Sequence, residues 1–179
     1  MSPNVDYTWK VLVGGMGGVG KTTLILRYLT GQFFGDTALT IGVEFHNHVL
    51  EHEGKTINLI LWDLGGEERF RFIQGTFMQG ARAAFVVFDL SRYATIAESR
   101  KWVDLIRSNN TPEIPILLVG AKEDLCDEET LRQAIDDAES LVQEMNLQGF
   151  IATSSKWGKN VGEAIQQLVE VLLQQVNYS

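Results

Sequence analysis

The segment that most restricts how this chain folds is 14-GGMGGVGKTT-23, which follows the apolar run 8-TWKVLV-13. Gly15, four further residues and 20-GKT-22 match the pattern GxxxxGK[ST]. Glycines between a strand and a helix let backbone N–H groups converge on phosphate oxygens, and the helix N-terminus favours their negative charge. The alternative is a glycine-rich turn that binds nothing, but strand and helix patterns lie on the correct sides of this loop. The segment therefore predicts a P-loop for nucleotide phosphates and is silent about the base.

The rest of the chain alternates between extended and helical patterns. The short apolar runs lie at 8–13, 55–63, 83–90, 114–120 and 149–153, and the helical patterns lie at roughly 20–30, 93–108, 128–146 and 160–176. Such alternation predicts an α/β fold of the P-loop NTPase type, with a doubly wound sheet and ligands at the carboxyl ends of the strands. Glu53-Gly54 is a turn signal inside 43–63, so we expect a β-hairpin and one antiparallel edge strand. We expect one domain over 1–179, with six strands in a mostly parallel sheet and about five helices.

The net charge and the cysteine count restrict which partners and which cellular compartment we expect. Fifteen Lys and Arg stand against 23 Asp and Glu, and the formal net charge of −8 argues against nucleic acid as a partner. Cys126 is the only cysteine, which excludes an intramolecular disulfide and favours the cytoplasm. No apolar run approaches the roughly 18 residues of a transmembrane segment. The terminal QQVNYS contains no cysteine, so we expect no prenylation in the chain as given.

Further polar residues follow the later strands. Asp63 ends an apolar run, where a carboxylate can hold Mg²⁺ through water, and Gly66 can offer its backbone N–H to a phosphate. Lys122 and Asp124 follow another run, and an Asp can accept from the paired N–H donors of guanine, a pair that adenine lacks. The segment 153-TSSK-156 follows the last run. Each of these signals is weak alone, since such residues usually mark ordinary turns or solvated loops.

Taken together, these motifs occur in the order and spacing of the Ras superfamily of small GTPases. The residues that carry the resemblance are 15-GMGGVGKT-22, Thr40, 63-DLGG-66, 122-KED-124 and 154-SSK-156. The chain resembles the Rab branch most closely, in the segments 40-TIGVEF-45, 60-ILWDLGGEERFR-71 and 77-FMQGARAAFVVFD-89 and at Trp102. The resemblance covers essentially the whole chain. It implies a nucleotide-dependent switch that hydrolyses GTP, with residues near 33–45 as switch I and 64–79 as switch II.

The resemblance also assigns site residues and partners. It implies catalytic roles for Lys21, Thr40, Gly66 and Glu67, and a Mg²⁺ site at Thr22, Thr40 and Asp63. The residues assigned to GTP or GDP are Gly15, Gly17, Gly18, Val19, Gly20, Lys21, Thr22, Thr23, Phe33, Thr40, Gly66, Lys122, Asp124, Leu125, Ser154, Ser155 and Lys156. An exposed aromatic surface for effectors is implied at Phe45, Trp62 and Phe77. Expected partners are an exchange factor, an activating protein and effectors. We expect a cytoplasmic monomer, peripheral to a membrane only if a tail or partner supplies the attachment.

Several positions depart from the family pattern. Glu67 stands where most relatives have the glutamine that orients the attacking water, and an ionised carboxylate cannot donate a hydrogen bond. Ala121 replaces the asparagine of NKxD, which predicts weaker nucleotide binding or faster exchange. Leu64 and Gly65 replace a threonine and an alanine. The sequence leaves open a hydrolysing switch or a GTP-loaded binding module that scarcely hydrolyses, and it disfavours a small-molecule kinase.

Three histidines share one face of the expected hairpin. His46, His48 and His52 alternate along the strand together with Glu44, which is geometrically possible for a metal site. A solvated face of an edge strand is the commoner explanation for such a pattern. The sequence does not decide between the two.

Overall fold

The computed structural model describes residues 4–35 and 37–179, without the side chains of Phe70 and Phe72. Residues 1–3 and Asp36, which belongs to the predicted switch I, lie outside the described part. The strands are β1 (Tyr7–Gly14), β2 (Val43–His52), β3 (Lys55–Leu64), β4 (Ala83–Asp89), β5 (Ile116–Ala121) and β6 (Gly149–Ala152). The helices are α1 (Lys21–Thr30), α2 (Arg71–Met78), α3 (Tyr93–Ser108), α4 (Glu128–Met145) and α5 (Val161–Asn177), with short 3₁₀ turns at Glu68–Phe70 and Glu123–Leu125.

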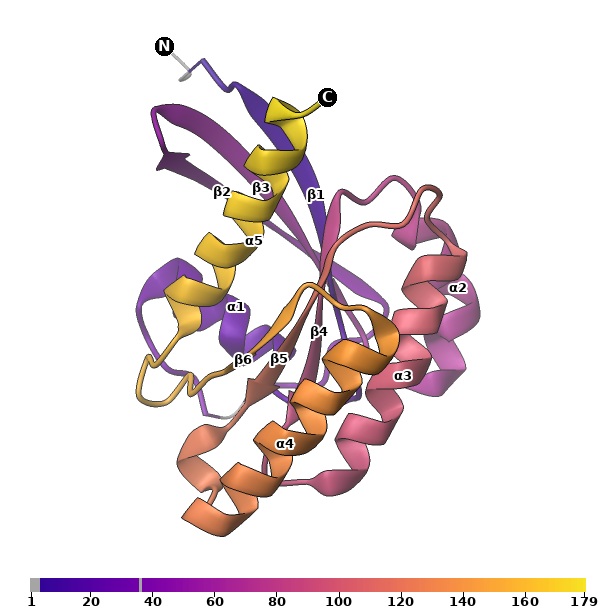
Figure 1. Ribbon diagram of the computed structural model, residues 1–179, viewed down its shortest axis with the longest axis vertical. Coiled ribbons are helices and arrows are strands. Elements are labelled where there is room, and N and C mark those ends of the chain that lie inside the picture. Colours follow the sequence, from indigo (N-terminus) through magenta and orange to yellow (C-terminus); the bar gives the residue numbers. More distant parts are fainter. Residues whose placement is uncertain (1–3, 36) are drawn as a thin grey trace.

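The strands form one six-stranded sheet in the order β2-β3-β1-β4-β5-β6. Among the described strands β2 alone runs antiparallel, and it is joined to β3 by a tight turn in which Glu53 (φ 49°) and Gly54 (φ 74°) are left-handed. Figure 1 shows α1 and α5 on one side of the sheet and α2, α3 and α4 on the other. The predicted α/β fold, with a mostly parallel sheet and one antiparallel edge strand, is therefore confirmed.

Two apolar cores fill the two sides of the sheet, because successive strand residues point to opposite faces. Val11 and Val13 of β1 pack beneath α1 and α5, together with Leu168 of α5. Leu12, between them in sequence, joins the core beneath α3, where Trp102 is almost fully buried. The near-continuous apolar runs of β1, β4 and β5 thus reflect burial on both faces.

Most elements begin and end within one residue of the predicted ranges, and two elements depart further. The strand expected at 114–120 begins at Ile116, because Pro115 has no N–H to donate to a ladder. The sequence pattern does not indicate α2, a helix of only 8 residues that contains Gly75. Its short length gives too few turns for a periodic pattern to stand out.

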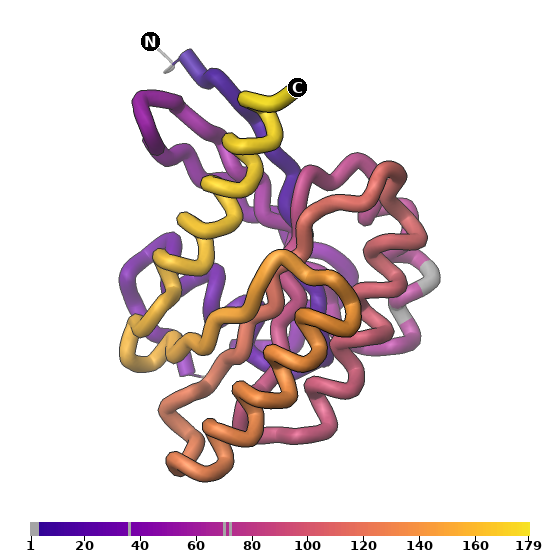
Figure 2. The backbone as a smooth tube through the Cα atoms, viewed as in Figure 1, coloured from indigo at the N-terminus to yellow at the C-terminus, as the bar shows by residue number. Residues whose placement is uncertain are grey.

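The carboxyl ends of the parallel strands meet at one end of the molecule. The backbone trace in Figure 2 shows the loops that follow these strands gathered there, while both chain ends lie at the opposite end. Polar side chains that follow different strands are therefore brought together. Among the described helices, none is both long and apolar enough to cross a membrane.

The two-sided core gives a first stability prediction. Val119 of β5 is fully buried, so Val119→Ala removes two methyl groups and leaves a cavity. We expect it to lower the free energy of unfolding by about 2 kcal/mol in urea denaturation. The matched control is Val49→Ala on edge strand β2, where the side chain is 43% exposed. This control is expected to cost less than about 1 kcal/mol, and equal losses at the two positions would contradict the described burial.

Candidate functional site

The P-loop lies between β1 and α1, and its glycines fit where a side chain does not. Gly15 has φ of 144°, and a Cβ there would lie 2.2 Å from the carbonyl oxygen of Val87. Gly20 is the left-handed residue directly before α1. The loop therefore follows β1 closely and turns its backbone toward the first turn of the helix. A pocket at this point is lined by Gly17, Gly18, Gly20, Lys21, Thr22, Thr37, Ala38, Leu39, Thr40, Gly66 and Glu67.

Lys21 is the buried cation of this pocket. Its Nζ donates to the carbonyl oxygens of Gly15 at 2.7 Å and Met16 at 2.8 Å. Desolvation lowers the pKa of Lys21 to about 8, although the charge of Asp63 acts in the opposite direction. Among the described residues no carboxylate forms an ion pair with this buried ammonium, so an anionic ligand would supply the missing counter-charge.

Three oxygen-bearing side chains converge beside Lys21. The Thr22 hydroxyl donates to Oδ2 of Asp63 at 2.5 Å and lies 2.8 Å from the Thr40 hydroxyl, which is itself 3.4 Å from the same Oδ2. Asp63 is fully buried, and burial raises its pKa, although the Thr22 hydroxyl and the Lys21 ammonium oppose the rise. Hard oxygen donors from three separate segments fit Mg²⁺, which prefers oxygen ligands. The donor set is therefore compatible with the implied metal.

The segment after β3 packs directly against the P-loop and switch I. A Cβ on Gly66 would lie 2.0 Å from the backbone nitrogen of Gly17, and a Cβ on Gly65 would lie 2.5 Å from the Thr40 carbonyl oxygen. Gly65 donates its N–H to the carbonyl of Gly42 at 2.7 Å. Even an alanine at Gly65 would force this contact apart. The unusual Gly65 is therefore a close-contact glycine in this conformation as well as a flexible one.

Gln74 of α2 holds the segments around Gly42 and Gly65 together by hydrogen bonds. It is fully buried, and its amide donates to the carbonyl oxygens of Gly65 at 2.7 Å and Gly42 at 3.1 Å. One side chain thus joins the two predicted switch segments. Nothing in the sequence marks Gln74, because a single glutamine in a short helix looks like a solvated residue.

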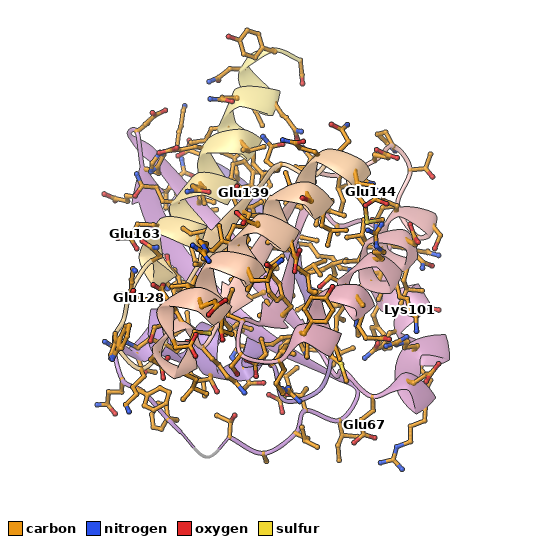
Figure 3. All side chains as sticks on the ribbon, turned by 60° about the horizontal axis from the view of Figure 1, so that its bottom comes forward. Glu67, Lys101, Glu128, Glu139, Glu144 and Glu163 are labelled. Carbon is orange, nitrogen blue, oxygen red and sulfur yellow. The ribbon has the colours of Figure 1, made fainter. Side chains whose placement is uncertain are left out.

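Glu67 lies at the rim of the pocket, paired with an arginine. Its Oε2 accepts from Nε of Arg69 at 2.5 Å. Figure 3 shows Glu67 at the outer edge of the molecule, on the loops at the end that comes forward in this view. An ionised carboxylate at this position accepts hydrogen bonds but donates none.

The predicted base loop is tied to the P-loop by Lys122. This residue is left-handed (φ 64°), and its Nζ donates to the Gly18 carbonyl at 2.7 Å and lies 3.1 Å from Oδ2 of Asp89. Burial raises the pKa of Asp89, but hydrogen bonds from Ser91, Arg92 and Lys122 together hold it below its usual value. Asp89 is the last residue of the apolar strand β4, and Asp63 is the last but one of β3. That parallel is the signal that could have identified it.

Asp124 and Ser154 meet across the same loop region. The Ser154 hydroxyl donates to Oδ1 of Asp124 at 2.7 Å, and Ser154 is fully buried. Ala121 is buried beneath the P-loop, where a Cβ on Gly20 would lie 3.7 Å from its own Cβ. Ala121 makes an apolar contact where an asparagine would offer polar atoms. The polar link between this loop and the P-loop is the hydrogen bond from Lys122. The predicted loss of nucleotide affinity through Ala121 stays a prediction.

Not every predicted site residue lies in the pocket. Thr23 pairs its hydroxyl with that of Thr37 at 3.1 Å, and Val19 is buried in the core beneath α1 and α5. Phe33 is 43% exposed and Leu125 is 63% exposed. Ser155 is buried, whereas Lys156 is exposed. The described P-loop, Thr40, Gly66 and Glu67 are thus brought together, while the outer base-side residues stand apart.

The three predicted effector aromatics form one cluster. The rings of Phe45 and Trp62 meet edge to face with centroids 4.4 Å apart, and the Phe77 centroid lies 6.1 Å from that of Trp62. Phe45 is 55% exposed and Phe77 37% exposed. The cluster therefore packs on itself and still offers apolar surface between β2, β3 and α2.

The glutamine contact gives a second prediction. Gln74→Met keeps a side chain of similar size but loses both hydrogen bonds, so we expect a loss of about 1–3 kcal/mol in unfolding free energy. Hydrogen exchange measured by mass spectrometry should quicken in peptides from 38–44 and 64–68 and stay unchanged in β4. Gln133→Met, on the exposed side of α4, is the control and should change neither quantity. Unaltered exchange in both switch segments would contradict the role of Gln74.

Comparisons with known proteins identify the family of this chain. The profile described as Ras family matches residues 10–174. The chain is 37% identical over 164 residues to the Ras-related protein Rab-11A of Dictyostelium discoideum, covering 92% of this chain and 75% of that protein. It is 35% identical over 176 residues to the probable Ras-related protein Rab-4A of Echinococcus multilocularis, covering 98% and 78%. Ras-related protein rab-11.1 of Caenorhabditis elegans is 34% identical over 172 residues, covering 96% and 80%. The chain belongs to the Ras family of small GTPases, in its Rab branch.

Proposed function

We propose that residues 1–179 form one G domain that binds GTP or GDP with Mg²⁺ and acts as a nucleotide-dependent switch. The observation that carries the proposal is the meeting of Lys21, Thr22 and Thr40 at one pocket, with the buried Asp63 carboxylate hydrogen-bonded to Thr22. These residues come from three segments far apart in the chain. Asp124, held by Ser154, supplies the guanine preference, because guanine offers it two N–H donors and adenine offers no matching pair.

Each proposed catalytic residue has a distinct task in phosphoryl transfer. The Lys21 ammonium would contact the β and γ phosphates and stabilise their negative charge. The Gly66 N–H would donate a hydrogen bond to the γ phosphate. Thr22, Thr40 and Asp63 would hold Mg²⁺, which when bound neutralises charge on the phosphate oxygens. Thr40 and Gly66 respond to the γ phosphate, so its loss on hydrolysis releases both switch segments.

A specific observation favours slow intrinsic hydrolysis as a second candidate property. Glu67 pairs with Arg69 at 2.5 Å, and the ionised Glu67 carboxylate would face an anionic γ phosphate. A glutamine at this position both accepts from water and donates, whereas Glu67 only accepts. We propose that the protein hydrolyses GTP slowly by itself and stays loaded until an activating protein supplies a further cation. The loaded form would recruit effectors through Phe45, Trp62 and Phe77.

The expected cellular role is regulation of membrane traffic by a cytoplasmic, monomeric protein, which attaches peripherally to a membrane where a tail or a partner supplies the attachment. This part of the proposal rests on membership of the Rab branch. An exchange factor would load GTP, and the aromatic cluster would dock an effector in the loaded state only, because it lies next to both switches.

The Glu67 proposal is tested by single-turnover hydrolysis of GTP with Mg²⁺. We expect Glu67→Gln to raise the rate at least about tenfold, corresponding to about 1.4 kcal/mol of transition-state stabilisation. Glu68→Gln, the neighbouring acid in an exposed position, is the matched control and should leave the rate unchanged. A wild-type rate equal to or above that of Glu67→Gln would show that Glu67 is a working substitute for glutamine.

Lys21 gives a prediction about pH. Its pKa in the free protein is about 8, since desolvation disfavours the ammonium. Bound phosphates restore the counter-charge and raise the pKa again, so binding above pH 8 must take up a proton. GDP affinity is therefore expected to be nearly constant below about pH 7, to fall about twofold between pH 7 and 8, and then to fall by at most about tenfold per pH unit.

Calorimetry in two buffers of different ionisation enthalpy checks this directly. Close to one proton should be taken up per GDP bound at about pH 9, and close to none at about pH 7. Lys21→Arg, whose guanidinium stays charged throughout, is the control and should lose the uptake attributed to Lys21. Identical proton uptake by the variant and the natural protein would exclude Lys21 as its source.

A further inference from the structure

The hairpin places a histidine and two carboxylates on one face. In the β2–β3 ladder Glu44 lies opposite Asp63, and His46 is two residues further along β2. Side chains two apart on a strand share a face, so all three project toward the side covered by α1 and α5. One carboxylate oxygen from each acid and one imidazole nitrogen of His46 lie within 4.8 Å of one another.

Asp63 and the partly exposed His46 each contain a buried side-chain atom without a hydrogen-bond partner in the described part of the chain. Oδ1 of Asp63 accepts no hydrogen bond, although Oδ2 accepts from the Thr22 hydroxyl. Nε2 of His46 is also unpartnered, and Oε2 of Glu44 lies 3.9 Å from it. Lys21 donates to backbone carbonyls rather than to Asp63. A fully buried carboxylate oxygen without a partner is costly, and a cation at this point would satisfy it.

The neighbouring histidines do not share this situation. His48 lies on the same face, but its ring packs edge to face on Tyr28 with centroids 4.9 Å apart. His52 lies near the far end of the strand, 3.8 Å from Glu170 of α5. Only His46, among these three, has a fully buried carboxylate within reach.

We propose that Glu44, His46 and Asp63 form a second divalent-cation site, selective for a borderline metal such as Zn²⁺. One imidazole nitrogen and two carboxylate oxygens make up a three-ligand zinc set that leaves a position for water. The imidazole distinguishes this site from the proposed Mg²⁺ site, whose donors are all oxygen. Ligand atoms in a tetrahedral zinc site lie about 3.5 Å apart, so the cluster must contract by about 1 Å. The half-exposed Glu44 side chain provides that movement.

The two cation sites would use opposite oxygens of one carboxylate. Oδ2 of Asp63 accepts from the Thr22 and Thr40 hydroxyls, and Oδ1, which has no partner among the described residues, would bind the second cation. The bound cation would thereby fix the strand that follows switch I to the Asp63 carboxylate. The zinc proposal requires neither GTP hydrolysis nor guanine selection, so its failure leaves the proposed function untouched.

The test is titration of the full chain with Zn²⁺ by calorimetry, in excess Mg²⁺ and GDP. The protein carries Cys126→Ser, so that the partly buried thiol contributes no ligand. We expect one zinc ion per chain, and with Co²⁺ in its place a visible absorption spectrum of low coordination number. His46→Ala should weaken binding at least about 100-fold, and the matched control His48→Ala should change it less than about twofold.

A second variant keeps the test decisive if His46→Ala does not fold, as judged by circular dichroism. Glu44→Gln changes a half-exposed side chain and should weaken zinc binding about tenfold. Equal zinc affinity of the natural protein and whichever variant folds would overturn the proposal. So would the lack of a saturable zinc site below about 100 μM in the parent protein.

Discussion

The hydrogen bonds at one buried carboxylate, Asp63, connect the parts of the candidate site. Asp63 lies at the end of β3, paired in register with Val13 of β1 and with Glu44 of β2. Its Oδ2 accepts from the hydroxyl groups of Thr22, at the start of α1, and Thr40, in switch I. P-loop, switch I and the strand leading into switch II therefore meet at one atom. Because the carboxylate is fully buried, any change in its charge or position alters the interactions of all three segments.

The contact between the two switch segments depends on two glycines, which have no Cβ. Gly65 and Gly66 approach the Thr40 carbonyl and the Gly17 nitrogen so closely that a Cβ on either would collide with backbone. Gln74 then holds the contact from the core side. The departures at Gly65 and Glu67 thus differ in kind. A Cβ at Gly65 would collide with the Thr40 backbone, whereas the Glu67 side chain lies at the rim of the pocket and pairs with Arg69. A switch built this way couples its two loops mechanically as well as through a shared ligand.

The fold could be predicted from the sequence because its signals are local and repeated. Alternating apolar runs and helical patterns identified the sheet, and the Glu53-Gly54 turn identified the antiparallel edge. The sequence pattern does not indicate the short helix α2, because 8 residues show little periodicity. The P-loop and Asp63 were visible because strand-end position and residue type coincide there. The roles proposed for them stay predictions.

Other parts of the site depend on contacts between residues distant in sequence. No local pattern shows that Gln74 is buried or that Lys122 reaches the Gly18 carbonyl, 104 residues away. The pairing of Glu67 with Arg69 depends on a 3₁₀ turn at Glu68–Phe70 that the pattern does not reveal. Similarly, the histidines of β2 look equivalent in sequence, and only the register opposite β3 separates His46 from His48. Packing decides each of these cases, and packing follows from the assembled sheet.

The most direct test of the account is equilibrium binding of GDP and of ADP to the full chain, each with Mg²⁺ and with a chelator. If Asp124 selects the base and the cluster around Asp63 holds Mg²⁺, GDP should bind at least about 100-fold more tightly than ADP. Removal of Mg²⁺ should then weaken GDP binding or speed its release. Equal affinity for ADP, or GDP binding that is unaffected by the chelator, would contradict the central claim that this site is built for a guanine nucleotide with Mg²⁺.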